Sequence, residues 1–566
     1  MKNDRFFLAI ITQYALLLFV APVCLGLVGV LLPAAGYFPA LGGTGISIEP
    51  LLAFLNMPGL GSAVFLSLST GLIATLLSFA GAVSLLLAFG GRGRGSWLLR
   101  CIAPIIAVPP TAIAAGYILL LAPSGWLFRL LSPEMTGFDA PPPYLVFPDP
   151  YGFGLVLTLF AKETPFILLL CLAALARLPA SEWLKISASL GYGRLSGFLL
   201  ILLPQIYRQI RLPLLAVLVF SISVVELPLL LGPTLPPPLS VLVFHGFQDA
   251  DLSMRFAASV GAVLQFGLVI LAWGLWRCGE QLVAAIAQYS IWKGRRGYSL
   301  DRVITPLGLI AVLPMVLFVL SLCVLLLWSV AQRWPFSANF PAQFTLSSWR
   351  EAGDLFAVMG QTAWIAFSAS CFANGLMLIW LHARPETRTS EQSRLRLLIY
   401  LPLLVPQISF LFGLQIGLSW LRLDGYIVSV IWAHALFILP YSYLILAPAD
   451  AAFDTRYMHI GASFGRSPFY QLIRIKWMMM MPAIGASLLI GLAVSISLYL
   501  PTLFAGAGRI TTLTVEAVGH IQSGARAYAS VAVLLQLTLP LVFFGILSSG
   551  LHLRFRRFAG MQGGQG

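Results

Sequence analysis

The sequence predicts an all-α integral membrane protein that crosses the membrane many times. Of its 566 residues, 59% are hydrophobic and only 10% are charged, whereas a soluble protein carries about a quarter charged residues. Long apolar stretches recur along the whole chain, and they lack the alternation of polar and apolar residues that membrane β-strands require. The abundance of apolar residues also excludes a disordered chain.

Twelve apolar stretches are long enough to be transmembrane helices, which need about 20 residues each. They cover residues 6–32, 60–89, 98–122, 152–176, 208–232, 257–278, 304–330, 357–381, 396–420, 425–448, 482–506 and 528–551. Lys2 and Arg5 precede the first stretch, as in a signal peptide. That stretch is too long for the apolar region of a signal peptide, so we expect a retained first helix.

The basic residues predict the orientation of these helices. If the N-terminus is cytoplasmic, 26 of the 34 Lys and Arg residues fall on the cytoplasmic side, seven fall outside and Lys162 lies within a stretch. Membrane proteins show this excess in their cytoplasmic loops. We therefore expect a multi-pass protein of the lipid bilayer with both termini in the cytoplasm. The net charge of +14 does not indicate nucleic-acid binding, because no soluble basic domain is present.

The two halves of the chain resemble each other. The segment 188–191 (Ala-Ser-Leu-Gly) recurs as 462–465 (Ala-Ser-Phe-Gly), and the triplets that begin at Ser221 and Leu239 recur at the same offset of 274. Val108-Pro109 with Gly116 recurs at an offset of 297. With six stretches in each half, the repeats have the same orientation. The fold class is therefore all-α, with about 12 transmembrane helices as two parallel six-helix repeats.

This duplication divides the chain into six segments. They are a first helix with its periplasmic loop (1–59), a first transmembrane domain (60–279), a basic cytoplasmic linker (280–303), a seventh helix with its periplasmic loop (304–356), a second transmembrane domain (357–552) and a cytoplasmic tail (553–566).

Each half has a long cytoplasmic loop between its fourth and fifth stretches. The pattern predicts a short helix, a turn at Gly191 or Gly465, and a second helix, because glycine permits the positive φ that ends a helix. In the first loop, Ile201, Leu203 and Pro204 follow Gly191 by ten, twelve and thirteen residues. In the second loop, Ile475 follows Gly465 by ten residues, and Trp477 and Met478 replace the leucine and proline.

These loops resemble the EAA loop of the permeases of binding-protein-dependent ABC importers, which have the type I fold. Lys185-Ile186-Ser187 and His459-Ile460-Gly461 stand where that family opens the motif with Glu-Ala-Ala. Loops that depart in this way from the Glu-Ala-Ala motif, in two permeases fused in one chain, look most like the ferric-iron and thiamine permease branch and its uncharacterised relatives. The segment 32–43 is also similar to such fused permeases.

The resemblance implies a transport subunit that is not an enzyme and moves a small solute across the inner membrane. It implies that two copies of a separate cytoplasmic ABC ATPase bind and hydrolyse ATP, and that a periplasmic solute-binding protein delivers the solute. No phosphate-binding Gly-x-x-x-x-Gly-Lys-[Ser/Thr] loop occurs in the chain, so we expect no cofactor here. The implied ATPase-coupling residues are Ser187, Ala188, Gly191, Ile201 and Pro204 in one loop, and Gly461, Ala462, Gly465 and Ile475 in the other.

Four polar residues within the apolar stretches are candidates for the translocation path: Lys162, Glu163, Glu226 and His434. An intramembrane charge costs about 2.5–3.5 kcal/mol on insertion scales and often has a function. Glu226 follows the repeated Ser-Ile-Ser, and Leu500 replaces it in the second half. We hypothesise that Glu226 lines the path; the alternative is a buried contact with Lys162 or water. Histidines such as His434 more often link helices by hydrogen bonds.

An alternative function is ion-coupled secondary transport of the major-facilitator type, because Gly91-Arg92-Gly93-Arg94-Gly95 resembles a loop motif of that family. The family's aspartate is missing, and residues 382–396 contain no second copy.

A membrane-embedded enzyme has no candidate catalytic residues, and the six histidines lack the paired spacing of a metal site. Iron, thiamine and other small solutes all remain open as substrates.

Overall fold

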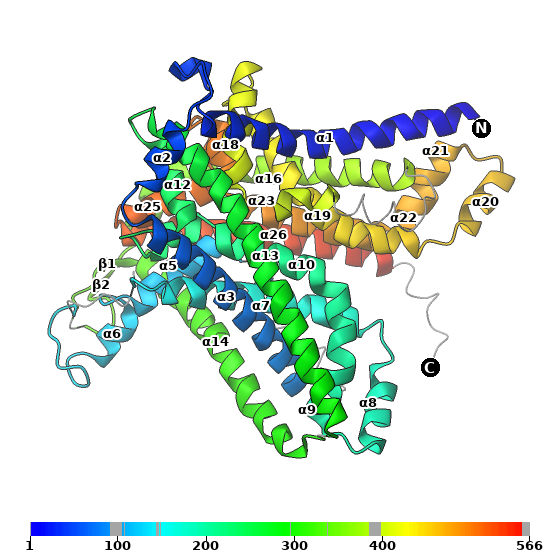
Figure 1. The fold of residues 1–566 in the computed structure, drawn as a ribbon, viewed down its shortest axis with the longest axis horizontal. Coiled ribbons are helices and arrows are strands. Elements are labelled where there is room, and N and C mark those ends of the chain that lie inside the picture. The colour runs from blue at the N-terminus through cyan, green and yellow to red at the C-terminus, as the bar shows by residue number, and fades with distance from the viewer. Residues whose placement is uncertain are drawn as a thin grey trace.

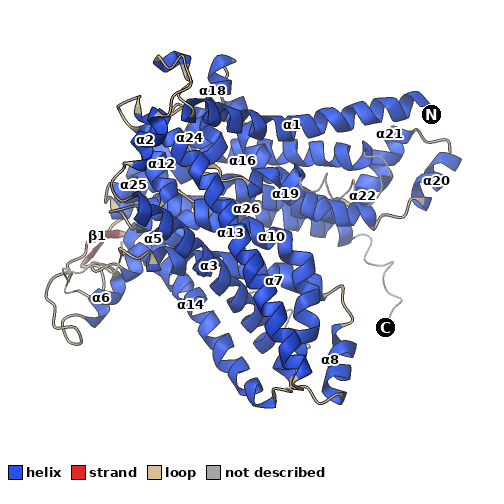
Figure 2. Ribbon diagram, viewed as in Figure 1, coloured by secondary structure: helices blue, strands red, loops and turns tan. Residues whose placement is uncertain are grey.

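The computed structural model describes residues 2–90, 105–106, 108–142, 147, 149–294, 296–336, 338–383 and 398–556. Most of these residues are helical, which confirms the predicted fold class (Figures 1 and 2). Within these ranges the only strands are β1 (Ala331–Arg333) and β2 (Gln343–Phe344), which pair antiparallel. The predicted motif at 91–95 lies outside the described residues, as do residues 557–566 of the predicted tail.

In the part of the first half that the structure describes, six longer helices alternate with several short ones. Its elements are α1 (Lys2–Ala34), η1 (Pro39–Leu41), α2 (Glu49–Leu55), α3 (Leu60–Phe89), α5 (Pro110–Leu121), α6 (Trp126–Leu131), α7 (Phe153–Leu175), α8 (Ala180–Ser189), α9 (Arg194–Gly197), η2 (Phe198–Leu202), α10 (Leu203–Ser223), α11 (Glu226–Leu231), α12 (Leu239–Gln248) and α13 (Met254–Trp292). A short 3-10 helix, η3 (Tyr298–Val303), leads into the second half.

The second half repeats this order. Its elements are α14 (Ile304–Ser329), α15 (Ser347–Glu351), α16 (Gly353–Ala383), α18 (Ile408–Trp420), α19 (Ile427–Ala451), α20 (Arg456–Ser463), α21 (Pro468–Gln471), η4 (Leu472–Lys476), α22 (Trp477–Met479), α23 (Met481–Ser497), α24 (Leu500–Gly506), α25 (Leu513–Gln522) and α26 (Arg526–Arg556). Helices α14, α16, α18, α19, α23 and α26 therefore correspond to α1, α3, α5, α7, α10 and α13.

The number of continuous spans is smaller than the twelve predicted. Among the described residues, nine helices are long and apolar enough to cross a membrane, or up to eleven if two bent pairs each count as one span. The first predicted stretch corresponds to α1, of which Val20–Ala34 forms a shorter apolar helix by the same test. Each of the other stretches overlaps a helix, but several of them are broken.

Two stretches predicted as single helices, 208–232 and 482–506, each end early. Helix α10 ends at Ser223 and α23 ends at Ser497, and short separate helices follow them. Pro228 lies four residues after Val224, and Pro501 lies four residues after Ser497. Proline cannot donate the helical hydrogen bond to the residue four positions earlier, and its ring clashes with that carbonyl. Hydrophobicity continues through both breaks, so it could not reveal them.

The stretches 98–122 and 396–420 are broken as well. In the second half, helix 398–404 and α18 meet at an angle of 106° around Val405-Pro406. In the first half, α5 begins at Pro110, after an extended Pro109. The residue before a proline avoids the helical conformation, which accounts for a break at the same repeated Val-Pro in each half.

The first helix of each half packs against the other half (Figure 1). Helix α1 lies on α18 and α13, while α14 lies on α5, α3 and α26. Both crossings use a glycine of the internal repeat: Gly413 meets Gly26 and Gly29 of α1, and Gly116 meets Ser321 of α14. Small residues permit such close helix contacts within a membrane. The two halves are therefore interleaved rather than separate.

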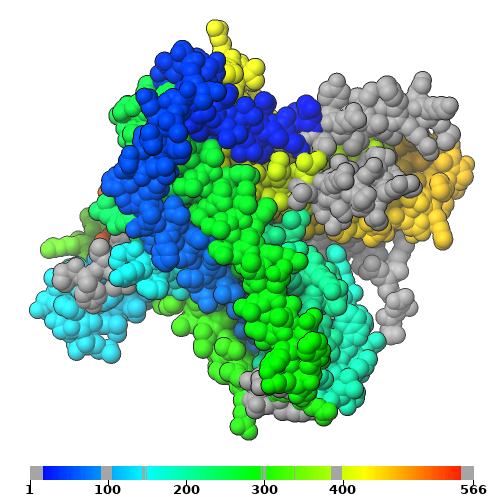
Figure 3. Space-filling model, in the orientation of Figure 1, coloured from blue at the N-terminus to red at the C-terminus, as the bar shows by residue number. Residues whose placement is uncertain are grey.

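The short elements gather at two opposite ends of the molecule. Helices α20 and α21 lie near the start of α1, at the right of the view, and α8 and α9 lie at its lower right, whereas α2, α6, α12, α25 and the β1–β2 pair lie at its left (Figure 1). Helix α13 lies on the surface between α3 and α10 (Figure 3). The two predicted coupling loops thus share one end of the molecule.

Candidate functional site: two matched loops and a polar interior

The first loop has the predicted helix, glycine turn and second helix. Gly191 follows α8 with φ of +82°. Its N–H donates to the Ala188 carbonyl over 3.0 Å, and the Tyr192 N–H donates to the Ser187 carbonyl over 3.1 Å. This pair of bonds is a Schellman motif, which ends a helix and needs a left-handed residue. The chain then returns through α9 and the π-helical turn η2 into α10.

The second loop has the same geometry. Gly465 has φ of +71°, and its N–H donates to the Ala462 carbonyl over 2.9 Å, while the Arg466 N–H donates to the Gly461 carbonyl over 3.2 Å. The π-helical turn η4 lies 274 residues after η2. The structure therefore confirms the predicted shape of both loops.

The inner faces of the two loops pack in a complementary way. In the first loop, the buried Ser187 lies against Gly197, where an added Cβ would be 2.3 Å from the Ser187 Oγ. In the second loop the small residue is on the other helix: Gly461 lies against Gln471, the residue equivalent to Gly197. Ile475 also packs on Gly461. Of the predicted coupling residues, Ser187, Gly461 and Ile475 therefore hold each loop together from inside.

The outer faces carry exposed apolar side chains that the predicted set missed. Ile186 and Leu190 on the first loop are 57% and 59% exposed, and their equivalents Ile460 and Phe464 are 53% and 77% exposed. Residues four apart lie on the same side of a helix. We call these four side chains the apolar pairs. The exposed small residues Ala188 and Ala462 lie beside them. The i, i+4 spacing of apolar residues in a polar loop was the signal available in the sequence.

A hollow of about 340 Å³ lies between α8 and α9. Its lining consists of Leu184, Ser187, Ala188, Tyr192, Gly193, Arg194 and Gly197, from α8 and α9. The two remaining predicted residues lie further along the loop, with Ile201 half-buried in η2 and Pro204 exposed at the start of α10. The hollow has room for a side chain of a docking protein.

Lys162, a predicted path residue, lies on α7 at the break before α5. Its Nζ donates to the carbonyls of Ile106 and Val108 over 3.1 and 2.9 Å. The Ile106 carbonyl has no helical partner, because Pro110 lacks an N–H. Lys162 therefore satisfies the carbonyl groups at the break. It does not form the contact with Glu226 considered above.

The neighbouring Glu163 is buried at the boundary between the halves. It interacts electrostatically with Lys162 and with Tyr441 of α19. Tyr441 in turn contacts Phe166 of α7 in an edge-to-face pair with centroids 6.4 Å apart. Among the described residues no lysine or arginine lies within ion-pair distance of Glu163. The carboxyl group thus lies where α7 and α19 meet.

Glu226 occupies the break after α10. The sequence placed it inside a continuous span, but it is the first residue of the short helix α11, and it is buried. It interacts electrostatically with Tyr499, which lies at the equivalent break after α23. Glu226 and Tyr499 therefore mark the equivalent breaks of the two halves.

His434 has both ring nitrogens hydrogen-bonded. Its Nδ1 lies 2.7 Å from the Ser495 Oγ and its Nε2 lies 2.9 Å from the Thr502 Oγ1. The ring is completely buried. These contacts join α19 to α23 and α24, which is the helix-linking role that the sequence also allowed.

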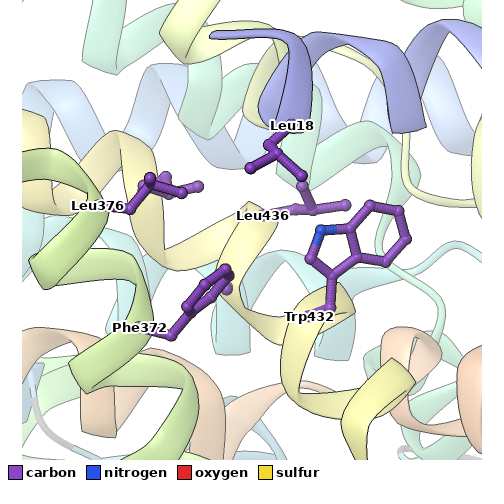
Figure 4. A pocket seen from close by; sticks show the side chains of 7 residues that line it. Leu18, Phe372, Leu376, Trp432 and Leu436 are labelled. Carbon is purple, nitrogen blue, oxygen red and sulfur yellow. The ribbon is translucent and has the colours of Figure 1, made fainter. Parts of the chain in front are cut away.

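An apolar notch lies between α1, α16 and α19 (Figure 4). Leu18, Phe372, Leu376, Trp432 and Leu436 line it, and it has no room for a water molecule. Apart from the indole N–H of Trp432 its lining is apolar, so it does not suit a hydrophilic solute. Glu163, Glu226 and Tyr499 remain the polar candidates in the interior.

Known proteins similar to this chain are transport permeases. The inner membrane ABC transporter permease protein YnjC of Escherichia coli K12 is 29% identical over 488 residues, which cover 84% of this chain and 86% of the relative. The putative 2-aminoethylphosphonate transport system permease protein PhnV of Salmonella typhimurium is 28% identical over 246 residues. That match covers 42% of this chain but 91% of the relative. No family model and no solved structure matches.

These matches agree with the internal duplication. A relative of one-permease size aligns with less than half of the chain, whereas another relative aligns with most of it. The matches favour an ABC permease over the ion-coupled secondary transporter. The chain is therefore the permease subunit of an ABC importer, with two permease units joined in one polypeptide.

Proposed function

We propose that this importer permease is driven through the apolar pairs of α8 and α20. Each pair docks on one copy of a separate ABC ATPase, which binds and hydrolyses ATP. The proposal rests on one observation: equivalent positions of the two loops expose large apolar side chains on the same face of the same turn. A short helix that presents such a face fits a hydrophobic groove on a partner.

The loop end of the molecule is then cytoplasmic. The basic residues support this orientation, because 26 of 34 fall on that side when the N-terminus is inside. Both termini would lie in the cytoplasm. The opposite end, with α2, α6, α12 and α25, would meet a periplasmic solute-binding protein that delivers the solute.

Each loop leads directly to an interior break. From the first loop the chain continues through η2 and α10 to Glu226, and from the second through η4, α22 and α23 to Tyr499. A shift of α8 relative to α20 therefore displaces one break against the other. ATP binding would bring the two loops together and open the interior to the periplasm, and release would reverse this movement.

The interior acids favour a small solute with a positively charged group. Glu163 and Glu226 are buried without an ion pair to lysine or arginine in the part of the chain that the structure describes. Thiamine and aminoalkyl phosphonates both carry such a group, and the name of PhnV refers to an aminoalkyl phosphonate. Ferric iron is a cation as well, so the ferric-iron and thiamine branch agrees with this substrate class.

The substitution Glu226→Gln should lower uptake of the solute by about tenfold or more, since hydrogen bonds to charged groups contribute about 1.5–3 kcal/mol. The measurement is ATP-dependent uptake of radiolabelled solute into proteoliposomes at equal protein content. Gln288→Ala, at an exposed side chain of α13, serves as the control and should transport normally. Normal uptake by the Glu226→Gln protein would exclude Glu226 from the path.

The function itself is tested by co-purification and energetics. The purified chain should retain a cytoplasmic ATPase, and vesicles that contain both should accumulate solute only when ATP is supplied on the loop side. Uptake driven by a proton gradient without ATP would contradict the proposal and favour the secondary transporter.

A further inference from the structure

The linker between the halves packs against the first loop. The Gly193 N–H donates to the Arg296 carbonyl over 2.9 Å. The carboxylate of Asp301 accepts the N–H groups of Arg194 and Leu195, each over 2.8 Å. These two N–H groups belong to the first turn of α9, where helical partners are lacking. Asp301 therefore caps α9 from a segment about 100 residues away in sequence.

The second loop caps itself at the equivalent position. Ser467, which corresponds to Gly193, accepts the Tyr470 N–H at its Oγ over 3.3 Å and starts α21. Serine is a favourable N-cap residue because its side-chain oxygen accepts such a bond. Gly193 has no side chain to do the same. The linker therefore provides the N-cap acceptor of the first loop, whereas the second loop provides its own.

Gly193 and Asp301 are also complementary in space. A Cβ added at Gly193 would lie 3.1 Å from both carboxylate oxygens of Asp301, which is a tight contact. The second loop has a different anchor, since Lys476 of η4 forms an ion pair of 2.6 Å with Asp450 of α19. The first loop is therefore held by the cap from Asp301, and the second loop by the ion pair between Lys476 and Asp450.

The linker is anchored at its other end as well. Glu280, near the end of α13, binds Arg211 of α10 through two bonds of 2.9 Å. Tyr207 of α10 donates to the same carboxylate. Because α10 is the helix that leaves the first loop, both ends of the linker contact the elements that follow α8.

We propose that the linker is a structural part of the first docking loop, with Asp301 as its positioning residue. Asp301 holds α9, and through α9 it sets the direction in which α8 presents Ile186 and Leu190. The second loop does not depend on the linker. This inference rests on the proposed docking function for its partner, but the cap is tested without any partner.

The test uses the purified full chain with three variants: Asp301→Ala, Gly193→Ser with Asp301→Ala, and Ser467→Ala. Asp301→Ala removes the cap together with the two carboxylate oxygens beside position 193, where the backbone has the extended conformation of an N-cap. A serine Cβ there then has one tight contact left, 3.1 Å from the Gly297 carbonyl oxygen, so the linker backbone has to shift by a few tenths of an ångström. We expect the amides of residues 194–197 to lose protection from hydrogen–deuterium exchange, while those of residues 469–471 keep theirs. The added serine should restore protection, and Ser467→Ala should affect only residues 469–471.

The second readout is binding of the co-purifying ATPase. Asp301→Ala should weaken it about fivefold, the change in an equilibrium that a lost helix cap typically causes, and the double variant should recover it. Unchanged exchange in Asp301→Ala would overturn the proposal. So would changed exchange with unchanged ATPase binding, or the absence of rescue by Gly193→Ser. Failure of the wild-type chain to bind an ATPase would instead reject the docking function, while the exchange data would still report on the cap.

Discussion

Replacing Gly413 by leucine should leave little folded protein. A Cβ at this position would lie 1.9 Å from the Gly26 carbonyl oxygen and 2.8 Å from its carbon, so α1 would have to separate from α18. Both partners are backbone atoms of long helices, which cannot move aside as a side chain can. The cost should exceed the roughly 1–3 kcal/mol of ordinary overpacking.

Gly417→Leu is the matched control, because Gly417 lies one turn further along α18 and has no atom near its position for a Cβ. The measurement is the yield of monodisperse protein after detergent extraction, together with its thermal unfolding midpoint. We expect normal values for Gly417→Leu and a large loss for Gly413→Leu. Equal yields of the two proteins would contradict the close crossing of α1 and α18.

Replacing all four side chains of the apolar pairs by aspartate should abolish ATPase binding without unfolding the chain. Truncating one central apolar contact of an interface can cost 2 kcal/mol or more, which is about 30-fold in affinity. Phe464→Asp alone should therefore weaken binding by about that factor, because it is the most exposed of the four. Exposed substitutions away from a contact usually change stability little.

Ser189→Asp with Ser463→Asp provides the control, since these residues are exposed on the same two helices and add the same type of charge. Co-purification of the ATPase and its stimulation by the permease are the two readouts. The control should retain both. If the four-aspartate protein binds the ATPase as the wild type does, α8 and α20 do not dock it.

The helical architecture and the loop pattern could be predicted from sequence because both depend on local features. Stretches of apolar residues locate the helices, and a glycine ten residues before an isoleucine located each turn. The internal repeat added a second copy against which each feature could be compared. Gly191 and Gly465 accordingly have the left-handed conformation that the pattern required.

The remaining features depend on contacts between distant segments. The break at Glu226 lies within an uninterrupted apolar stretch, where only Pro228 marked it. Whether Ser187 faces inward or outward depends on its contact with Gly197, which the spacing of the motif does not contain. The cap from Asp301 joins residues about 100 positions apart. Such pairings follow from the packing of the whole chain.

Because the first helix of each half packs against the other half, the order of synthesis constrains assembly in the membrane. Helix α1 is made well before its crossing partner, because Gly413 follows Gly29 by 384 residues. At about 5–20 residues per second, the ribosome needs about 20–80 s to supply that partner. Until then, α13 is the main element of its own half on which the described part of α1 packs. The glycine face of α1 is therefore exposed to lipid or to an insertion factor during synthesis, and assembly of the two halves completes only after α18 has been inserted.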